Sequence, residues 1–125
     1  MDCLFCKINA GLIPTKSLYE DEVVNVIMDI NPTSNGHILI IPKKHFIDFE
    51  NMNDETLIHI NTIAKKMKIN LYSALNPDGL VLCVNYGINQ VIKHYHLHLT
   101  PVYKNKQVIK DIDIVYKEIK SQLKD

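Results

Sequence analysis

The stretch His94-Tyr95-His96-Leu97-His98-Leu99 alternates strictly between histidine and an aromatic or aliphatic residue. Strict alternation of this kind predicts a half-buried β-strand, in which successive side chains point to opposite faces of the sheet. The three histidines would therefore share one face, with like-facing side chains spaced by roughly 6–7 Å along the strand. The three residues between and after them would share the other face. We expect one face to be buried and the other to carry a row of imidazoles.

The composition is that of a globular domain without a charge bias. The chain has 125 residues, 46% hydrophobic and 22% charged, with 14 Lys plus Arg against 14 Asp plus Glu. This balance favours no nucleic-acid partner and no membrane partner, because it provides no net field to steer the chain toward either. All the cations are lysines, so a phosphate site would use backbone N–H groups, amides, imidazoles or Lys rather than a guanidinium fork.

The longest apolar runs, such as residues 38–41, are far too short to span a bilayer. We expect no targeting segment at the start of the chain, because an acidic residue follows Met1 and no long apolar stretch comes after it. We therefore expect a cytoplasmic protein. In that compartment thiols stay reduced, which favours free or metal-bound cysteines over disulfides.

Periodicity along the chain predicts an α+β fold. Apolar steps of three and four residues predict a long helix over Asp54–Leu75, with Asn53 as its N-cap, and a helix in the C-terminal extension. A short helical turn is expected over 6–10, and a loop over 86–90. The alternating or apolar runs that predict strands are 17–20, 23–28, 37–41, 80–85 and 94–100.

Runs of strands interrupted by one long helix, without regular βαβ alternation, favour an antiparallel sheet of about five strands. We expect one domain over 1–125, with a core over about 3–101 and a helical extension over 108–124. In the strand over 80–85, Cys83 is expected to be a small buried residue. On the long helix, His59 is expected to face solvent.

The histidine row has three interpretations from the residues alone. It could be a set of polar side chains on a wet strand face. It could be a metal site, since an H-x-H pair on a strand offers two ligands on one face. It could carry nucleophilic catalysis, because a neutral imidazole has a reactive lone pair and titrates near pH 7.

The pair Cys3 and Cys6 is also open to several interpretations: a redox pair, half of a metal site, or chance at an apolar helix start. A thioredoxin-like pair should follow a strand, whereas only Met1 and Asp2 precede this one. A zinc site would need two further ligands, and no second close pair of ligands follows along the chain.

The histidine run resembles the signature of the histidine triad (HIT) superfamily, and four other blocks match that family in order. They are Cys3-Leu4-Phe5-Cys6-Lys7-Ile8, Asp29-Ile30-Asn31-Pro32, Gly36-His37-Ile38-Leu39-Ile40-Ile41-Pro42-Lys43-Lys44-His45 and Val84-Asn85-Tyr86-Gly87. The resemblance runs from about Cys3 to Pro101 and is strongest to the small bacterial members of the Hint-like branch.

The resemblance implies a nucleotide hydrolase or nucleotidyl transferase. His96 would attack the α-phosphorus of a nucleotide, form a covalent nucleotidyl-imidazole, and release a nucleoside monophosphate after attack by water. His98 would contact the phosphate and the leaving group, and His94 and His37 would complete the catalytic set. The resemblance leaves the choice between phosphoramidates and dinucleoside polyphosphates open.

The resemblance also implies the remaining substrate contacts. Asn85, Gln90 and backbone N–H groups of the 86–90 loop would bind the phosphate. Asp29 would accept hydrogen bonds from the ribose hydroxyls, although an aspartate before this loop could equally start a turn. Purine nucleotides are the implied ligands. The side chains that would line the base slot are Ile27, Met28 and Ile30.

For the metal, the resemblance adds His45 and His94 to Cys3 and Cys6. Four protein ligands would make a closed, structural zinc site, and no catalytic metal is expected. His45, which follows two lysines, could instead be a polar cap to a strand. The resemblance further implies a homodimer whose sheets join across the long helix and a strand edge.

Two departures from the family pattern favour a second hypothesis. The segment between Asn85 and His94 is about two residues shorter than in typical Hint-like proteins. Gln90-Val91 stands where many relatives have Gln-Ser, so a hydroxyl that assists the phosphate and leaving group is missing. The alternative function is a slow or non-catalytic nucleotide-binding or scaffold protein of the same fold. A metal-centred enzyme that uses the three histidines as ligands is a third hypothesis.

Overall fold

The computed structural model describes residues 3–123. The helices are α1 (Leu4–Asn9), α2 (Asp54–Leu75) and α3 (Ile112–Gln122), with two 3-10 turns, η1 (Phe49–Asn51) and η2 (Gly87–Asn89). The strands are β1 (Ser17–Glu20), β2 (Val24–Met28), β3 (Ile38–Pro42), β4 (Gly79–Cys83) and β5 (Leu97–Val102). Within this described part, no helix combines the length and apolar character needed to cross a bilayer. The last residue of the expected 108–124 extension lies outside the described residues.

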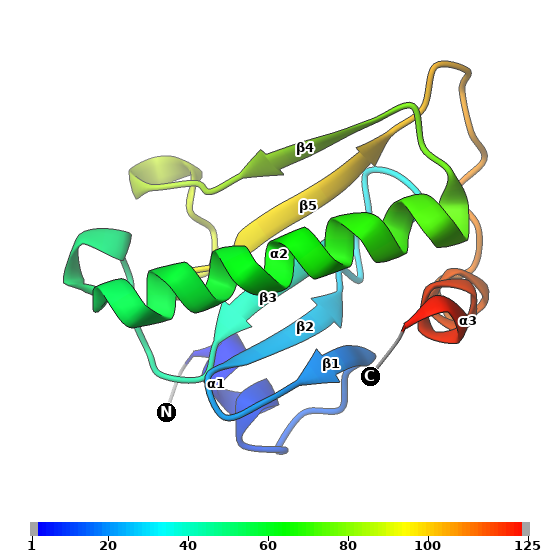
Figure 1. The fold of residues 1–125 in the computed structure, drawn as a ribbon. Helices are drawn as coiled ribbons and strands as arrows, with labels where there is room; N and C mark the ends of the chain where they lie inside the picture. The colour runs from blue at the N-terminus through cyan, green and yellow to red at the C-terminus, as the bar shows by residue number, and fades with distance from the viewer. Residues whose placement is uncertain (1–2, 124–125) are drawn as a thin grey trace.

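The five strands form one sheet in the order β1-β2-β3-β5-β4, and every pair of neighbours is antiparallel. The predicted α+β class and antiparallel sheet are confirmed. β5, the last strand in sequence, lies between β3 and β4, and α2 runs across one face of the sheet (Figure 1). The histidine run therefore enters the interior of the sheet and not its edge.

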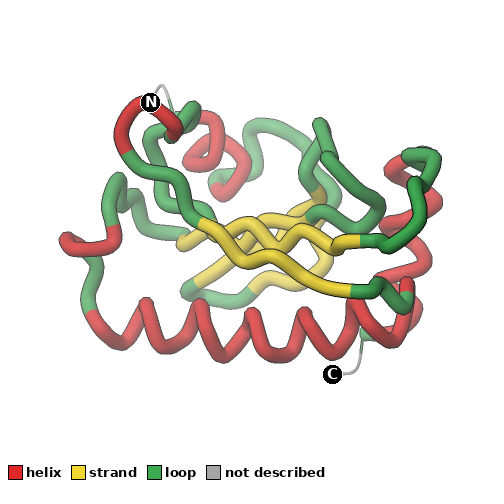
Figure 2. Tube along the Cα trace, turned by 90° about the horizontal axis from the view of Figure 1, so that it is seen from above, coloured by secondary structure: helices red, strands yellow, loops and turns green. Residues whose placement is uncertain are grey.

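Apolar side chains fill both sides of the central strands. On the side of α2, alternate residues of β2, β3 and β5 pack with Ile60, Met67 and Leu71 of the helix. On the opposite side a smaller cluster is formed by Phe5, Ile27, Leu39 and Ile41. Viewed from above, α2 lies along one face of the sheet and α1 lies beyond the other face (Figure 2). The sheet is thus the middle layer of three.

The alternation predicted for the histidine run is present, but the strand begins later than predicted. Tyr95, Leu97 and Leu99 are buried in the cluster that faces α2. Pairing with β3 starts only at Leu97, so His94 and His96 lie in the approach to β5.

The strand also continues through Pro101 to Val102, beyond its predicted end at residue 100. Pro101 lies inside β5 opposite Leu80. The carbonyl of Pro101 accepts from Ser34 Oγ at 2.6 Å, on the side away from β4. The missing N–H of Pro101 therefore removes no ladder bond to β4.

The burial predicted for the strand over 80–85 is wrong. β4 is an edge strand, and Val81 and Leu82 remain 48% and 47% exposed. Cys83, expected to be buried, is exposed as well. An apolar run has the same sequence pattern on a covered strand and on an uncovered edge, which is why burial did not follow from the pattern.

α2 has the bounds that the apolar stripe predicts, and its end is set by a residue that tolerates left-handed backbone. Asn53 occupies the N-cap position, and Asp54 and Glu55 lie in the first turn, where the helix dipole favours negative charge. At the other end Asn76 adopts φ 48° and ψ 55°, and its N–H donates to the carbonyl of Tyr72. This turn directs the chain from α2 back into β4.

His59 does not simply face solvent as predicted. Its Nε2 lies 2.7 Å from Asp21 Oδ2, which also accepts from the hydroxyl of Tyr19 at 2.7 Å. Asp21 Oδ1 accepts from the backbone N–H groups of Val23 and Val24 at 2.8 Å. Asp21 therefore joins the β1–β2 turn to α2.

We expect Asp21→Asn to lower the free energy of unfolding by about 1–2 kcal/mol at pH 7. Burial opposes the charge of Asp21, but the four hydrogen bonds outweigh it and lower the pKa of this carboxyl to about 2. A depressed carboxyl pKa stabilises the fold above the unfolded-state value near 4, and that stabilisation disappears as the pH falls from about 4 to 2. Urea unfolding of wild type and of Asp21→Asn at pH 7 and at pH 2 checks this.

The control for Asp21 is Glu22→Gln, an exposed neighbour in the same turn. It should leave stability within about 0.5 kcal/mol of wild type. A difference between wild type and Asp21→Asn that persists unchanged at pH 2 would contradict the assignment of the effect to the carboxylate.

Candidate functional site

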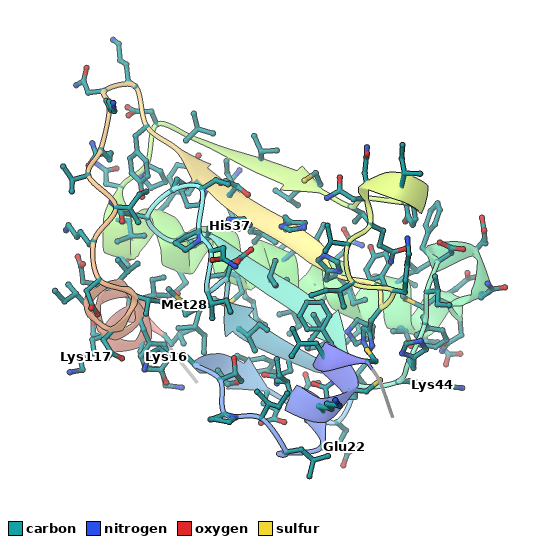
Figure 3. All side chains as sticks on the ribbon, turned by 180° about the vertical axis from the view of Figure 1, so that it is seen from behind. Lys16, Glu22, Met28, His37, Lys44 and Lys117 are labelled. Carbon is teal, nitrogen blue, oxygen red and sulfur yellow. The ribbon has the colours of Figure 1, made fainter. Side chains whose placement is uncertain are left out.

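The histidine face is the sheet face opposite α2. Figure 3 looks onto this face, with the label on His37, the residue that immediately precedes β3. The rings of His96 and His98 have centroids 4.9 Å apart, and those of His37 and His98 are 5.2 Å apart. The Phe5 ring contacts His96 edge-on, with a centroid distance of 5.0 Å. Side chains predicted separately for catalysis are thus contiguous on one face.

The hydrogen bonding of His96 determines which of its nitrogens is free. Nδ1 lies 2.8 Å from the carbonyl oxygen of His94. A carbonyl oxygen only accepts, so Nδ1 carries the proton and a neutral ring has its lone pair on Nε2. His96 is only 7% exposed. The ring is therefore oriented with a nucleophilic nitrogen that does not bond to the backbone.

The tautomers of His37 and His98 follow in the same way. His37 Nδ1 accepts from the backbone N–H of Thr33 at 3.2 Å, so a neutral His37 carries its proton on Nε2. This Nε2 lies 2.9 Å from His98 Nδ1, which must then accept. His98 consequently carries its own proton on Nε2. Burial lowers the pKa of His37, which favours the neutral ring that this arrangement needs.

His98 has a buried donor without a partner. Its Nε2 makes no hydrogen bond within the described residues 3–123. Burial, together with the nearby His96 and His37, lowers the pKa of His98 to about 4, so the ring is neutral at pH 7. Because buried polar groups are normally hydrogen-bonded, an unpaired N–H on this face is suited to an acceptor supplied by a ligand.

The carboxylate of Asp29 contacts both the backbone of its own loop and the ring of His37. Its Oδ1 accepts from the backbone N–H of Asn31 at 2.8 Å, which is the turn-forming role considered from the sequence. Its Oδ2 lies 3.4 Å from His37 Nε2. Asp29 therefore shares the histidine face with His37 and His98, and the three side chains bring possible ligand atoms within 4.8 Å of one another.

The four side chains predicted to hold zinc come together, although they lie far apart in the sequence. His94 Nδ1 is 3.3 Å from Cys3 Sγ and 3.5 Å from Cys6 Sγ. His45 Nδ1 is 3.2 Å from Cys6 Sγ and 3.2 Å from His94 Nδ1. At zinc–ligand bond lengths of about 2.0–2.3 Å, the edges of a tetrahedron are about 3.3–3.8 Å. We call these four residues the Cys/His cluster.

The bonding around His94 leaves its cluster-facing nitrogen free for a metal. Nε2 lies 2.9 Å from the carbonyl oxygen of Pro42, so Nε2 carries the proton and Nδ1 the lone pair. Burial lowers the pKa of His94 to about 4. In the absence of a cation, burial and the neighbouring Cys3 thiol raise the pKa of Cys6 to about 11. The donor set fits a divalent metal, which stabilises thiolates in such a site.

The predicted phosphate and base contacts are only partly assembled. Gln90 is 2% exposed, and its Nε2 donates to the carbonyl of Ile47 at 2.9 Å, which holds one amide hydrogen away from a ligand. Val91 is 90% exposed on the adjoining loop. The Asn85 side chain makes no hydrogen bond among residues 3–123 and is partly exposed. These three residues stay predictions as phosphate contacts.

The three residues predicted to line the base slot do not share a face. Ile27 belongs to the apolar cluster on the histidine face, whereas Met28 is buried in the core under α2. Strand alternation is the reason, since adjacent residues of β2 must point to opposite sides. Ile30, just beyond β2, is 74% exposed. The structure therefore separates Met28 from the histidine face.

Sequence reasoning missed two features of the site. Phe5 packs edge-on against both His94 and His96, with ring centroids 5.7 Å and 5.0 Å away. A cavity of about 730 Å³ opens beside the Cys/His cluster; the residues that line it are Cys3, Leu4, Cys6, His45, Ile47, Val91, Ile92 and Lys93. The match of the 3–8 block to the family could have drawn attention to Phe5, whereas nothing in the sequence indicates the cavity.

The chain belongs to the HIT family, since the HIT domain family profile matches residues 10–105. An uncharacterised HIT-like protein of Methanocaldococcus jannaschii is 40% identical over 94% of this chain and 98% of its own. An adenosine 5'-monophosphoramidase of Schizosaccharomyces pombe is 36% identical over 81% of this chain and 74% of its own. A zinc-bound histidine triad protein of Mycobacterium smegmatis superposes with a TM-score of 0.88, at 29% identity, covering 98% of this chain and 93% of that one.

Proposed function

We propose that the protein is a nucleotide hydrolase or nucleotidyl transferase that acts at the α-phosphorus of a purine nucleoside phosphoramidate or dinucleoside polyphosphate. One observation carries the proposal: His96 presents a lone pair on Nε2 beside an unpaired N–H on His98 Nε2. Membership of the HIT family supports nucleotide hydrolysis in general, and the phosphoramidase activity named for the Schizosaccharomyces pombe relative supports the first of the two substrates.

In the first step, His96 Nε2 attacks the α-phosphorus and the bond from phosphorus to the leaving nitrogen or oxygen breaks. His98 Nε2–H donates a hydrogen bond to the leaving atom and keeps its proton; a phosphoramidate nitrogen takes a proton from solvent and leaves as the neutral amine, and a polyphosphate oxygen leaves as the anion. The carbonyl of His94 holds the proton of His96 Nδ1 and so stabilises the positive charge that develops on that ring. The products are a nucleotidyl-His96 intermediate and the free leaving group.

In the second step, water attacks the same phosphorus. The water loses one proton to solvent and keeps the other, and the phosphorus–nitrogen bond breaks, which returns its electron pair to His96 Nε2. His37 keeps His98 in the productive tautomer throughout, because its Nε2–H donates to His98 Nδ1. The nucleoside monophosphate leaves, and the enzyme is unchanged.

A quench-and-mass experiment tests the proposal. The protein is mixed with an adenosine phosphoramidate, denatured within seconds, and the intact chain is weighed. We expect a mass gain of one AMP that is absent from His96→Asn. Release of AMP with no adduct in repeated time points would favour direct attack by water. Binding without adduct or AMP would favour the slow or non-catalytic nucleotide-binding alternative and would make Val91→Ser the next variant.

We further propose that the Cys/His cluster holds one zinc ion as a structural site. The tetrahedral spacing of its ligand atoms supports this, as does the zinc-bound relative of similar fold. Zinc bound there would cross-link α1, the segment after β3 and the approach to β5. No step of the proposed reaction passes through the metal.

We expect one zinc per chain, and we expect Cys6→Ser to weaken zinc binding by about 100-fold. Competition with a chromophoric chelator measures both. The matched control is Cys83→Ser, which removes the exposed cysteine of β4 outside the cluster and should bind zinc as wild type does. Equal zinc loss in both variants would contradict the assignment. The metal-centred enzyme hypothesis, in which the three histidines are the ligands, predicts instead that chelation removes the metal and the activity together.

The free edge of β4 supports the expected homodimer. Val81, Leu82 and Cys83 leave an apolar surface and unpaired backbone groups at the end of the sheet, and such an edge is suited to pair with a second copy. Light scattering should give twice the chain mass, and Leu82→Lys should reduce it to the mass of one chain. The cytoplasmic location stays a prediction.

A further inference from the structure

We propose that His94 is a positioning residue that couples the Cys/His cluster to the nucleophile, so that a metal bound in the cluster sets the orientation and tautomer of His96. The catalytic consequence of this inference rests on the proposed function. The coupling itself is a property of the fold and can be measured without a substrate.

His94 takes part in both sites through different groups. Its ring is fully buried, with Nδ1 facing Cys3 and Cys6 and Nε2–H donating to the carbonyl of Pro42. Its own backbone carbonyl accepts the proton of His96 Nδ1 at 2.8 Å. The residue whose ring faces the cluster therefore also supplies the acceptor that defines the tautomer of His96, so a shift of its backbone would change both contacts.

The β3–β5 ladder does not extend to the backbone of His94, and the sheet contacts this residue through its ring, at the carbonyl of Pro42. Pairing between β3 and β5 ends at Ile40 and Leu97, so His94 and His96 lie beyond the ladder. The backbone around them is tied by the N–H of His94 to the carbonyl of Ile92 at 2.8 Å and by the N–H of Tyr95 to the carbonyl of Phe46 at 2.6 Å. Ile92 and Phe46, which supply these two carbonyls, both lie in loops. The ring of His94 is thus a main anchor of the approach to β5.

The packing of Phe5 is a second connection between the cluster and His96. Cys3 is the N-cap of α1, and its sulfur accepts from the backbone N–H of Cys6 at 3.4 Å. Phe5 follows between these two cysteines and packs edge-on against both His94 and His96. Fixing the two sulfurs therefore fixes the ring that covers the nucleophile.

The cluster is accessible in the folded protein. His45 is exposed, and both cysteines of the cluster line the cavity of about 730 Å³. A metal can therefore enter and leave without unfolding of the sheet. Occupancy then becomes a variable that the free metal concentration sets, and the state of His96 follows it.

The expected effect falls on turnover rather than on substrate binding. Loss of a group that orients a functional histidine typically costs about 10–100-fold. We expect kcat to fall about tenfold in metal-free protein while KM changes less than about twofold. We expect this small change in KM because the expected ribose contact, Asp29, does not depend on the cluster. Its carboxylate contacts Asn31 and His37, neither of which belongs to the cluster.

The test follows the imidazole nitrogens of His96 by NMR in the full chain labelled with ¹⁵N-histidine, while zinc is added to metal-free protein. We expect zinc to convert a mixture of His96 tautomers into the single form protonated on Nδ1. His45→Gln removes the exposed ligand and keeps His94, so it should shift this conversion to higher zinc concentrations. Cys83→Ser is the matched control and should titrate as wild type does.

An unchanged His96 spectrum between metal-free and zinc-loaded wild type would overturn the inference, and so would conversion at the same zinc concentration in His45→Gln. The experiments distinguish a failure of the coupling from a failure of the proposed function. If zinc sets the His96 tautomer but no nucleotide is hydrolysed, the coupling holds and the proposed function fails. If metal-free and loaded protein hydrolyse the nucleotide with the same kcat and the same tautomer, the function holds and the coupling fails.

Discussion

Replacing His96 with asparagine should lower kcat on an adenosine phosphoramidate by about 10⁴-fold or more, the range seen when a nucleophile or its partner is removed. The asparagine amide can still donate to the carbonyl of His94, where His96 Nδ1 lies at 2.8 Å. The side chain then has no nitrogen lone pair to attack phosphorus. Steady-state release of AMP measures the loss, and calorimetric titration with AMP should give a Kd within about threefold of wild type.

His59→Asn is the matched control for this substitution. His59 lies on α2, on the opposite side of the sheet, and bonds to Asp21. It should retain kcat within about twofold, apart from a modest loss of stability. If His96→Asn kept more than about a tenth of the wild-type kcat, attack by His96 would not be the route.

Gly36→Ala should destabilise the fold by about 3 kcal/mol, which corresponds to a fall in Tm of roughly 10 °C. Gly36 has φ +93°, a left-handed conformation that L residues rarely adopt. A Cβ added there would overlap the Cδ1 atom of Leu75 at the end of α2 and approach Pro101 Cγ to 3.1 Å. Thermal unfolding of the purified variant measures the effect.

Gly11→Ala separates the backbone strain of a positive φ from the steric overlap of the added Cβ. Gly11 has a similar φ of +77°, but a Cβ there would meet nothing within 4 Å. It should therefore show the backbone cost alone, about 1–2 kcal/mol. Equal losses in the two variants would mean that the close approach to Leu75 and Pro101 contributes nothing. Because His37 follows Gly36 directly, we also expect kcat to fall in Gly36→Ala and to be preserved in Gly11→Ala.

The periodicity of apolar residues was sufficient to predict those elements that pack against the same neighbour along their whole length. The bounds of α2 match the apolar stripe, because one helix face packs against one sheet face throughout. The division of the histidine run into two faces is confirmed for the same reason. The burial of β4 was not predictable, because its apolar residues reflect a free edge rather than a covered strand.

The family resemblance named the histidines and cysteines that the structure brings together, but not the contacts between them. No spacing rule brings His45 and His94 to the cysteines, since their proximity depends on the whole sheet. The contact of His37 with His98 likewise requires β3 and β5 to be neighbours. In contrast, the separation of Met28 from Ile27 follows from strand alternation and could have been predicted from the sequence of β2 alone.

The position of β5 has a consequence for how activity arises during folding. β5 is the last strand to be synthesised, yet it lies between β3 and β4. β3 and β5 are separated by more than fifty residues, so their pairing is a non-local contact that forms slowly. A nascent chain can form the β1–β2–β3 meander and α2 before the histidines emerge from the ribosome. The chain therefore completes its sheet and places the proposed nucleophile in one late event, and a molecule without β5 would lack the candidate site.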